Sequence, residues 1–327
     1  MRKSRAIKRV IFFLIFGLVP IVLLYQAMLS HHVLPILSES ISFDEKAYLM
    51  AEKETNKFDV LALGSSITLD NLSTEVMQEH LGQQYTYANL GSWGLKMHNH
   101  QEVLKVYVER FDPKVVIINA SRRDFRGEDI SIASADDLEM FLQGQYPYFY
   151  LKNINLYKML SRNRWGGARR RDHSTPFSLA FDQGGGVSLH VPDSVTEMRP
   201  QCLEPHQPTD SIHYAALDSI CQLLKRRRIQ LVFVESIYNA PEAEEAFYRS
   251  VIAQHTSRTR SIVERNGHIH LDLSGLSQAT PDSMFADDVH LNESGAIMLT
   301  QRILQQVNVR DLVTAGVSTV EPSYTNN

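Results

Sequence analysis

Short apolar segments alternate with amphipathic segments along most of the chain, and this alternation limits the possible folds more than any other feature. "DVLALG" starts the series at Asp59, and "KVVIINAS" at 114–121 is strongly apolar. "YTYANLG", "RIQLVFVESI" and "HIHLDLSGL" follow the same pattern. Helical periodicity fills the gaps, as in "MHNHQEVLKVYVERF". Apolar strands joined by helices predict an α/β fold with a parallel sheet covered on both faces.

The amino-terminal segment predicts a membrane anchor. "MRKSRAIKR" is strongly basic, and no charged residue occurs from Val10 to Leu29. About 20 apolar residues span the hydrocarbon core of a bilayer. The basic segment favours a cytoplasmic N-terminus, which would place the following domain in the periplasm or outside the cell. A cleaved signal peptide is the alternative, but no small-x-small cleavage site follows the apolar segment. We therefore expect an uncleaved single-pass signal anchor that contacts the membrane through residues 10–29.

Four further divisions of the chain follow from the same patterns. We expect the basic segment and anchor to occupy residues 1–30 and a stalk to occupy 31–57. A catalytic domain over 58–312 and a flexible polar tail over 313–327 complete the chain. Within the domain, residues 126–207 interrupt the alternation with segments rich in aromatic residues, Gly and Arg. Insertions of this length commonly serve as lids or binding segments, or else are disordered linkers, and whether this one covers a site stays open.

Composition excludes some classes of function. A net charge of -4 and a pI near 6.4 argue against a general nucleic-acid-binding protein. No Cys/His cluster has the spacing of a zinc site, so we expect neither a metal nor another cofactor. Cys202 and Cys221 are the two cysteines, and the sequence does not decide between a disulfide and two free thiols. It also says nothing about protein partners.

Polar residues follow several of the predicted strands. Gly64-Ser65-Ser66 comes directly after the first strand, and "NLGSWG" follows the second. "NASRRDF" follows the strand at 114–121, and "MFADDVHLNESG" comes after the last strand. Because the carboxyl ends of parallel strands share one edge of the sheet, we expect these segments to meet there.

This ordered set resembles the SGNH (GDSL-like) hydrolase superfamily over residues 58–125 and 228–307. The resemblance implies a flavodoxin-like three-layer sandwich with a central parallel sheet. Gly64-Ser65-Ser66 resembles the first block of the family, Gly-Asp-Ser, and implies that Ser66 is the nucleophile. The segment from Asp287 to His290 resembles the last block, Asp-x-x-His. The match implies His290 as the base and Asp287 as its orienting partner, with the adjacent Asp288 as the alternative.

The resemblance also implies an oxyanion hole. Gly94 is similar to the second-block glycine, whose backbone N–H would act together with that of Ser66; Gly91 is the nearby alternative. The third-block Gly-x-Asn-Asp is absent, and "NASRRDF" occupies its place. Asn119 lies a little too early on the strand to replace the missing asparagine. Arg122 or Arg123 could supply N–H donors instead, and Arg122 is the expected third donor.

Two residues beside these segments are candidates for substrate binding. Arg123 is one of them, although Arg122 and Arg123 could instead pair with Asp124. Trp93 is the other, since it could wall the acyl pocket or simply fill the core. Together with Ser66, His290 and Asp287 these residues complete the predicted site.

The resemblance implies an exported serine esterase or O-acyltransferase that acts on acyl esters, with cell-envelope carbohydrate as the expected substrate class. The altered third block motivates one alternative, a weakly active or inactive binding module of envelope assembly. The anchor and the aromatic insertion motivate another, a lipid esterase at the membrane surface. The sequence does not decide between hydrolysis and transfer, and it does not identify the acyl donor or acceptor.

Overall fold

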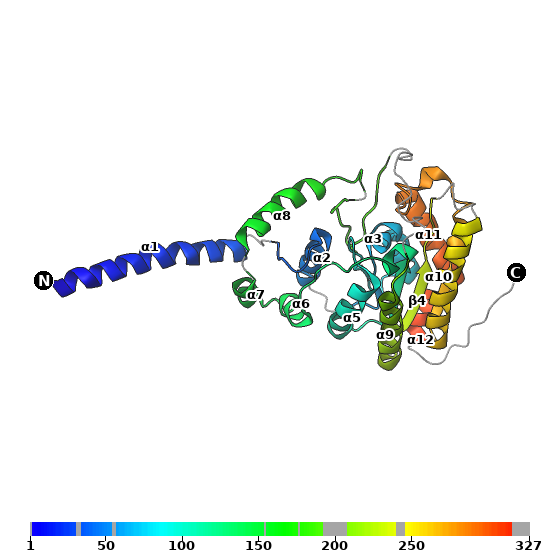
Figure 1. The fold of residues 1–327 in the computed structure, drawn as a ribbon, viewed down its shortest axis with the longest axis horizontal. Helices are drawn as coiled ribbons and strands as arrows, with labels where there is room; N and C mark the ends of the chain where they lie inside the picture. Colours follow the sequence, from blue (N-terminus) through cyan, green and yellow to red (C-terminus); the bar gives the residue numbers. More distant parts are fainter. Residues whose placement is uncertain are drawn as a thin grey trace.

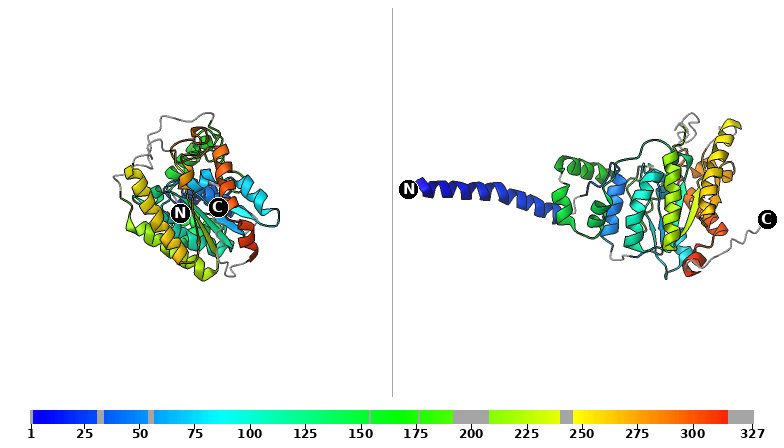
Figure 2. Two further views of the ribbon diagram at one scale, coloured as in Figure 1. Left: turned by 90° about the vertical axis from the view of Figure 1, so that its right-hand side faces the viewer. Right: turned by 60° about the horizontal axis from the view of Figure 1, so that its bottom comes forward.

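A five-stranded parallel sheet organises the chain (Figure 2). The computed structural model describes residues 2–30, 34–53, 57–153, 155–175, 177–191, 208–239 and 246–315. The strands are β1 (Val60–Ala62), β2 (Tyr87–Asn89), β3 (Val115–Ala120), β4 (Gln230–Glu235) and β5 (Ile269–Asp272). Their order is β2-β1-β3-β4-β5, and every neighbouring pair is parallel. This is the 2-1-3-4-5 order of flavodoxin-like folds, and it confirms the predicted parallel α/β sheet.

Helices cover both faces of the sheet, as the apolar strands require. One face packs mainly against α5 (Met97–Phe111) and α9 (Ser211–Arg227), and α10 (Ala246–Arg265) adds Val263 to the same cluster. The other face packs against α4 (Thr74–Leu81), α11 (Glu293–Gln306) and α12 (Val309–Ala315). All six residues of β3 are buried, because this strand lies in the middle of the sheet. In the described part of the chain, short 3₁₀ segments lie in the connections: η1 (Arg122–Phe125), η2 (Ser274–Leu276) and η3 (Asp282–Met284).

The predicted membrane anchor is not supported by the structure. Its residues belong to α1 (Arg2–Ser30), which extends away from the rest of the chain (Figure 1). None of the helices in the described part of the chain combines the length and the apolar character that crossing a membrane requires. The prediction of a single-pass membrane protein with a cytoplasmic N-terminus and an exported domain is therefore wrong.

The segment that we expected to be a stalk packs against the sheet. It contains α2 (Ile41–Ala51), whose Phe43 and Met50 are buried in the same cluster as Leu61 of β1. The Lys46 ammonium is also fully buried, and it donates hydrogen bonds to the carbonyl oxygens of Asn89, at 2.9 Å, and Gly185. This helix therefore contributes to the core beside the sheet, while the limits of the predicted domains stay a prediction.

The insertion contains α6 (Ala135–Leu142), α7 (Tyr146–Lys152) and α8 (Leu156–Arg169). After α8 the chain returns to the edge of the sheet, where the Asn89 amide donates to the Gly184 carbonyl at 2.8 Å. Gly185 has a φ of +93°, and a Cβ there would lie 2.7 Å from the Asn89 carbonyl oxygen, so the close approach depends on glycine. Cys202 lies outside the described residues and Cys221 is buried on α9, so the question of a disulfide stays open.

Candidate active site

The turn after β1 places Ser66 at the carboxyl end of the sheet. Ser66 is the first residue of α3 (Ser66–Asn71), and the Ser65 side chain caps this helix by accepting from the Ile67 amide at 3.3 Å. The tight turn depends on Gly64, since a Cβ there would come within 1.8 Å of Thr68 Oγ1. The sequence thus forces the chain to bend between strand and helix, and this bend presents the Ser66 hydroxyl above the sheet.

The loop before α11 brings His290 to the same point. His290 Nε2 lies 2.8 Å from Ser66 Oγ, and His290 Nδ1 lies 2.7 Å from Asp287 Oδ2. The other carboxylate oxygen of Asp287 accepts from the amides of Val289 at 2.9 Å and His290 at 2.7 Å. With its proton on Nδ1, the imidazole donates to Asp287 and accepts from the Ser66 hydroxyl through Nε2. The structure therefore brings together the three residues that the sequence predicted as a triad.

Asn71 connects the helix of Ser66 to the loop of His290. Its side-chain amide donates to the Val289 carbonyl at 2.9 Å, and its Oδ1 accepts from the Leu291 amide at 2.8 Å. Because these bonds hold the backbone on each side of His290, they help to fix the position of the imidazole relative to Ser66. Asn71 could not be identified from the sequence, because an asparagine at the end of a short helix carries no signal of such a long-range contact.

The charges around His290 favour its protonated form. Burial disfavours the imidazolium, but the charge and the hydrogen bond of Asp287 outweigh burial, and the pKa of His290 is raised above its usual value. The pKa of the Asp287 carboxyl is lowered: burial raises it, and the facing imidazole and two backbone N–H bonds lower it by more. Asp287 is thus an ionised partner of the imidazole. The adjacent Asp288, which was the alternative, accepts from the Asn239 amide through its backbone carbonyl at 2.9 Å.

Of the predicted oxyanion donors, Gly94 lines the cavity beside Ser66 and Arg122 does not. Gly94 lines the same cavity as Ser66 and has a φ of +76°, a conformation that favours glycine. The Gly91 amide, its alternative, already donates to Asn89 Oδ1 at 2.9 Å. Arg123 lines the cavity, whereas Arg122 is buried outside its lining, with its amide 3.4 Å from the Tyr238 hydroxyl.

A cavity of about 560 Å³ opens beside Ser66 and His290. Trp93, a candidate for substrate binding, forms part of its wall, and its ring meets two further rings edge to face. Trp165 lies 6.2 Å away and Phe177 lies 5.7 Å away, measured between ring centroids. Trp165 is on α8 and Phe177 follows it, so the insertion supplies part of the wall of the cavity. The guanidinium of Arg169 lies over both outer rings, at 5.0 and 5.8 Å from their centroids.

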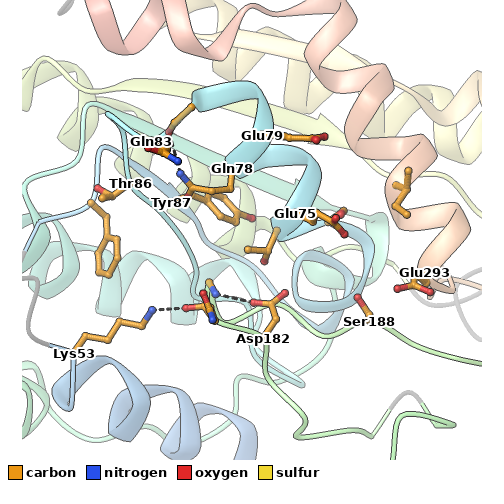
Figure 3. Close-up of a pocket in the computed structure, with 17 residues that line it drawn as sticks. Lys53, Glu75, Gln78, Glu79, Gln83, Thr86, Tyr87, Asp182, Ser188 and Glu293 are labelled. Carbon is orange, nitrogen blue, oxygen red and sulfur yellow. Dashed lines mark hydrogen bonds between the residues drawn. The ribbon is translucent and has the colours of Figure 1, made fainter.

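A larger cavity of about 860 Å³ lies along α4 (Figure 3). Its charged lining includes Glu75 and Glu79 on α4, together with Lys53 and Asp182 (Figure 3). The residues described as lining it include none of those predicted for the site. The larger cavity is therefore not the candidate active site, because Ser66, Asp287 and His290 line the smaller one.

Comparisons with known proteins give a likeness of fold. No family model and no curated protein matches the sequence. Among solved structures, Axe2, an acetylxylan esterase from Geobacillus stearothermophilus, is 12% identical, with a TM-score of 0.40, over 77% of this chain and 95% of that chain. LAE5, an alpha/beta hydrolase enzyme from the metagenome of Lake Arreo, Spain, is 13% identical, with a TM-score of 0.41, over 83% of this chain and 100% of that chain. At these values the likeness says nothing about the chemistry of this chain.

Replacement of Asp287 tests the arrangement of the triad. Asp287→Asn removes the charge that orients the imidazole, so kcat for an activated ester should fall about 1,000- to 10,000-fold. The Asp287 charge raises the pKa of His290, so the pKa should fall in the variant. The loss of residual activity on the acidic side of the pH profile should therefore move to a lower pH. Asp288→Asn should cost far less. A loss for Asp288→Asn equal to that for Asp287→Asn would contradict the assignment.

Proposed function

We propose that this protein is a serine esterase or O-acyltransferase of SGNH type that acts on acyl esters. The observation that carries the proposal is the pair of contacts at His290, 2.8 Å to Ser66 Oγ and 2.7 Å to Asp287 Oδ2. A hydroxyl becomes a useful nucleophile when a neighbouring base takes its proton and a third group orients that base. All three groups lie at the carboxyl edge of a parallel sheet, where such folds bind their ligands.

The proposed reaction begins with attack of Ser66 Oγ on the ester carbonyl carbon. The serine proton moves to His290 Nε2, and the imidazolium is stabilised by Asp287. The tetrahedral oxyanion accepts hydrogen bonds from the amides of Ser66 and Gly94. Collapse of this intermediate breaks the bond to the alcohol, which takes the proton from His290 and leaves an acyl ester on Ser66. Water or another hydroxyl then attacks the acyl group with His290 as base, which restores the free serine.

The third oxyanion donor is the weakest part of the site. The sequence suggested Arg122, but the cavity lining contains Arg123, whose guanidinium carries several N–H donors. We therefore assign the third contact to Arg123. Loss of one oxyanion donor typically lowers the rate about 100- to 1,000-fold, so an imperfect third contact gives a slow enzyme.

We further propose that the ester is borne by a carbohydrate. The rings of Trp93, Trp165 and Phe177 offer apolar faces and edges beside Ser66. The apolar C–H face of a sugar ring packs on such aromatic surfaces, while its hydroxyls need polar partners. Glu39 and Arg123 line the same cavity and supply an acceptor and a donor. A purely aliphatic chain would leave Glu39 without a role in binding.

Reaction with a fluorophosphonate probe tests the nucleophile. The wild-type protein should be labelled on the peptide that contains Ser66, and Ser66→Ala should remove the labelling. Ser65→Ala is the matched control, since Ser65 is adjacent but caps α3, and it should still be labelled. Equal labelling of wild type and Ser66→Ala would contradict the proposal.

Tryptophan fluorescence tests the carbohydrate assignment. The chain has two tryptophans, and both line the cavity, so all tryptophan emission comes from the site. Acetylated and unacetylated oligosaccharides should change the emission of Ser66→Ala. Trp165→Ala should raise KM for an acetylated oligosaccharide about tenfold through lost stacking. Tyr157→Ala is the control, because Tyr157 lies on the same helix and is 85% exposed, against 45% for Trp165. Equal effects of the two variants would contradict the assignment.

The replacement of the third block keeps a second candidate function in view. Asn119 is buried within β3, where its side-chain amide donates to the Ile67 carbonyl at 3.4 Å, so it does not supply the missing donor. A binding module that retains the fold would change its fluorescence with oligosaccharides and would not react with the fluorophosphonate. The two experiments together therefore separate an enzyme from a binding module.

A further inference from the structure

A second carboxylate lies next to the triad. Asp70 is on α3, one helical turn after Ser66, and its side chain is 1% exposed. Its Oδ2 lies 3.8 Å from His290 Nε2, the nitrogen that faces the Ser66 hydroxyl. Within the described residues, neither carboxylate oxygen of Asp70 has a hydrogen-bond partner. Because an unsatisfied buried carboxyl group is costly for the fold, its presence beside a reacting group needs an explanation.

Asp70 also lies in a field of other buried charges. The titratable groups that face it are His290 and Asp287 from the loop before α11, and Lys46 from α2. Lys46 is fully buried and held by two backbone carbonyls, so its position is fixed relative to the sheet. Thus His290 stands between two carboxylates, Asp287 at Nδ1 and Asp70 near Nε2, and a lysine lies beyond the second one.

We propose that Asp70 is a positioning residue that stabilises the imidazolium form of His290 when the proton of Ser66 arrives on Nε2. This inference rests on the proposed function, since it requires His290 to act as the base. A negative charge 3.8 Å from Nε2 lowers the energy of the imidazolium, and burial reduces the screening of this attraction by water. Asp70 makes and breaks no bond to the substrate, and it acts through His290 alone.

The charge of Asp70 depends on pH. Burial raises the pKa of its carboxyl to about 8, with Asp287 acting in the same direction and His290 and Lys46 in the opposite one. Below this pH the carboxyl is neutral and resembles an asparagine side chain. Above it the carboxylate is charged and supports proton transfer to His290. The rate of acylation should therefore increase in two steps as pH rises, first when His290 loses its proton and again near pH 8.

The rate of fluorophosphonate labelling as a function of pH tests this inference. The wild-type rate should rise about tenfold through the second step. The Asp70→Asn variant should lack this second step. About two pH units below the step, the variant and the wild type should be labelled at the same rate, because Asp70 of the wild type is then protonated both in the free and in the reacting protein. Asp70→Ser removes the charge with a smaller side chain, and it gives the same test if the asparagine variant does not fold. Glu235→Gln, which alters an equally buried carboxylate beside His255 and His270, should keep both steps.

Three results would overturn the inference. A single step in the wild type would do so while leaving the proposed function intact, and so would a second step that persists in both Asp70 variants. An equal loss of rate at every pH would make Asp70 a purely structural residue. Absence of labelling in the wild type at all pH values would instead remove the proposed function, and this inference with it.

Discussion

The hydrogen bond between Ser66 and His290 joins residues 224 positions apart in the chain, and the geometry of the candidate active site depends on it. Its length of 2.8 Å is possible because β1 and the loop before α11 end at the same edge of the sheet. Asn71 adds a second link, with one bond on each side of His290. The parallel sheet thus serves as the rigid support, and two short connections carry the reactive side chains.

Buried charges around the contact between Ser66 and His290 determine how well His290 can accept a proton. Asp287 is held ionised by the imidazole and by two backbone amides, so it can stabilise a charged His290. Asp70 and Lys46 extend the same network towards α2, and burial acts on each of them, raising the pKa of Asp70 to about 8 and lowering that of Lys46 to about 7. Helix α2 therefore connects to the site through charge as well as through packing.

The parallel sheet could be predicted from the sequence, and so could the grouping of Ser66, Asp287 and His290 at one edge of it. Continuous apolar strands at 59–63 and 114–121 have few alternatives to a buried parallel sheet, and motifs at strand ends meet because the strands are parallel. Other features of the site depend on local geometry that the sequence does not specify. Arg122 and Arg123 are neighbours, and only the geometry of η1 decides which one reaches the cavity.

Long-range packing explains most of what the sequence did not reveal. Trp165 and Phe177 come to the cavity through the path of the insertion, which no local pattern specifies. The predicted stalk contains α2, whose buried Phe43 and Lys46 are understandable only beside the sheet. At the amino terminus an apolar run predicted a membrane span, and the helices of the described chain do not provide one.

In the proposed reaction, Ser66 forms a covalent acyl intermediate with His290 as its base. Intact-mass spectrometry of the protein, quenched in acid during turnover of an activated acetyl ester, measures this intermediate directly. We expect a mass increase of one acetyl group, located on the peptide that contains Ser66 and absent in Ser66→Ala. Turnover of the ester without such an adduct, or with the acetyl group on another residue that is essential for turnover, would contradict the proposed reaction.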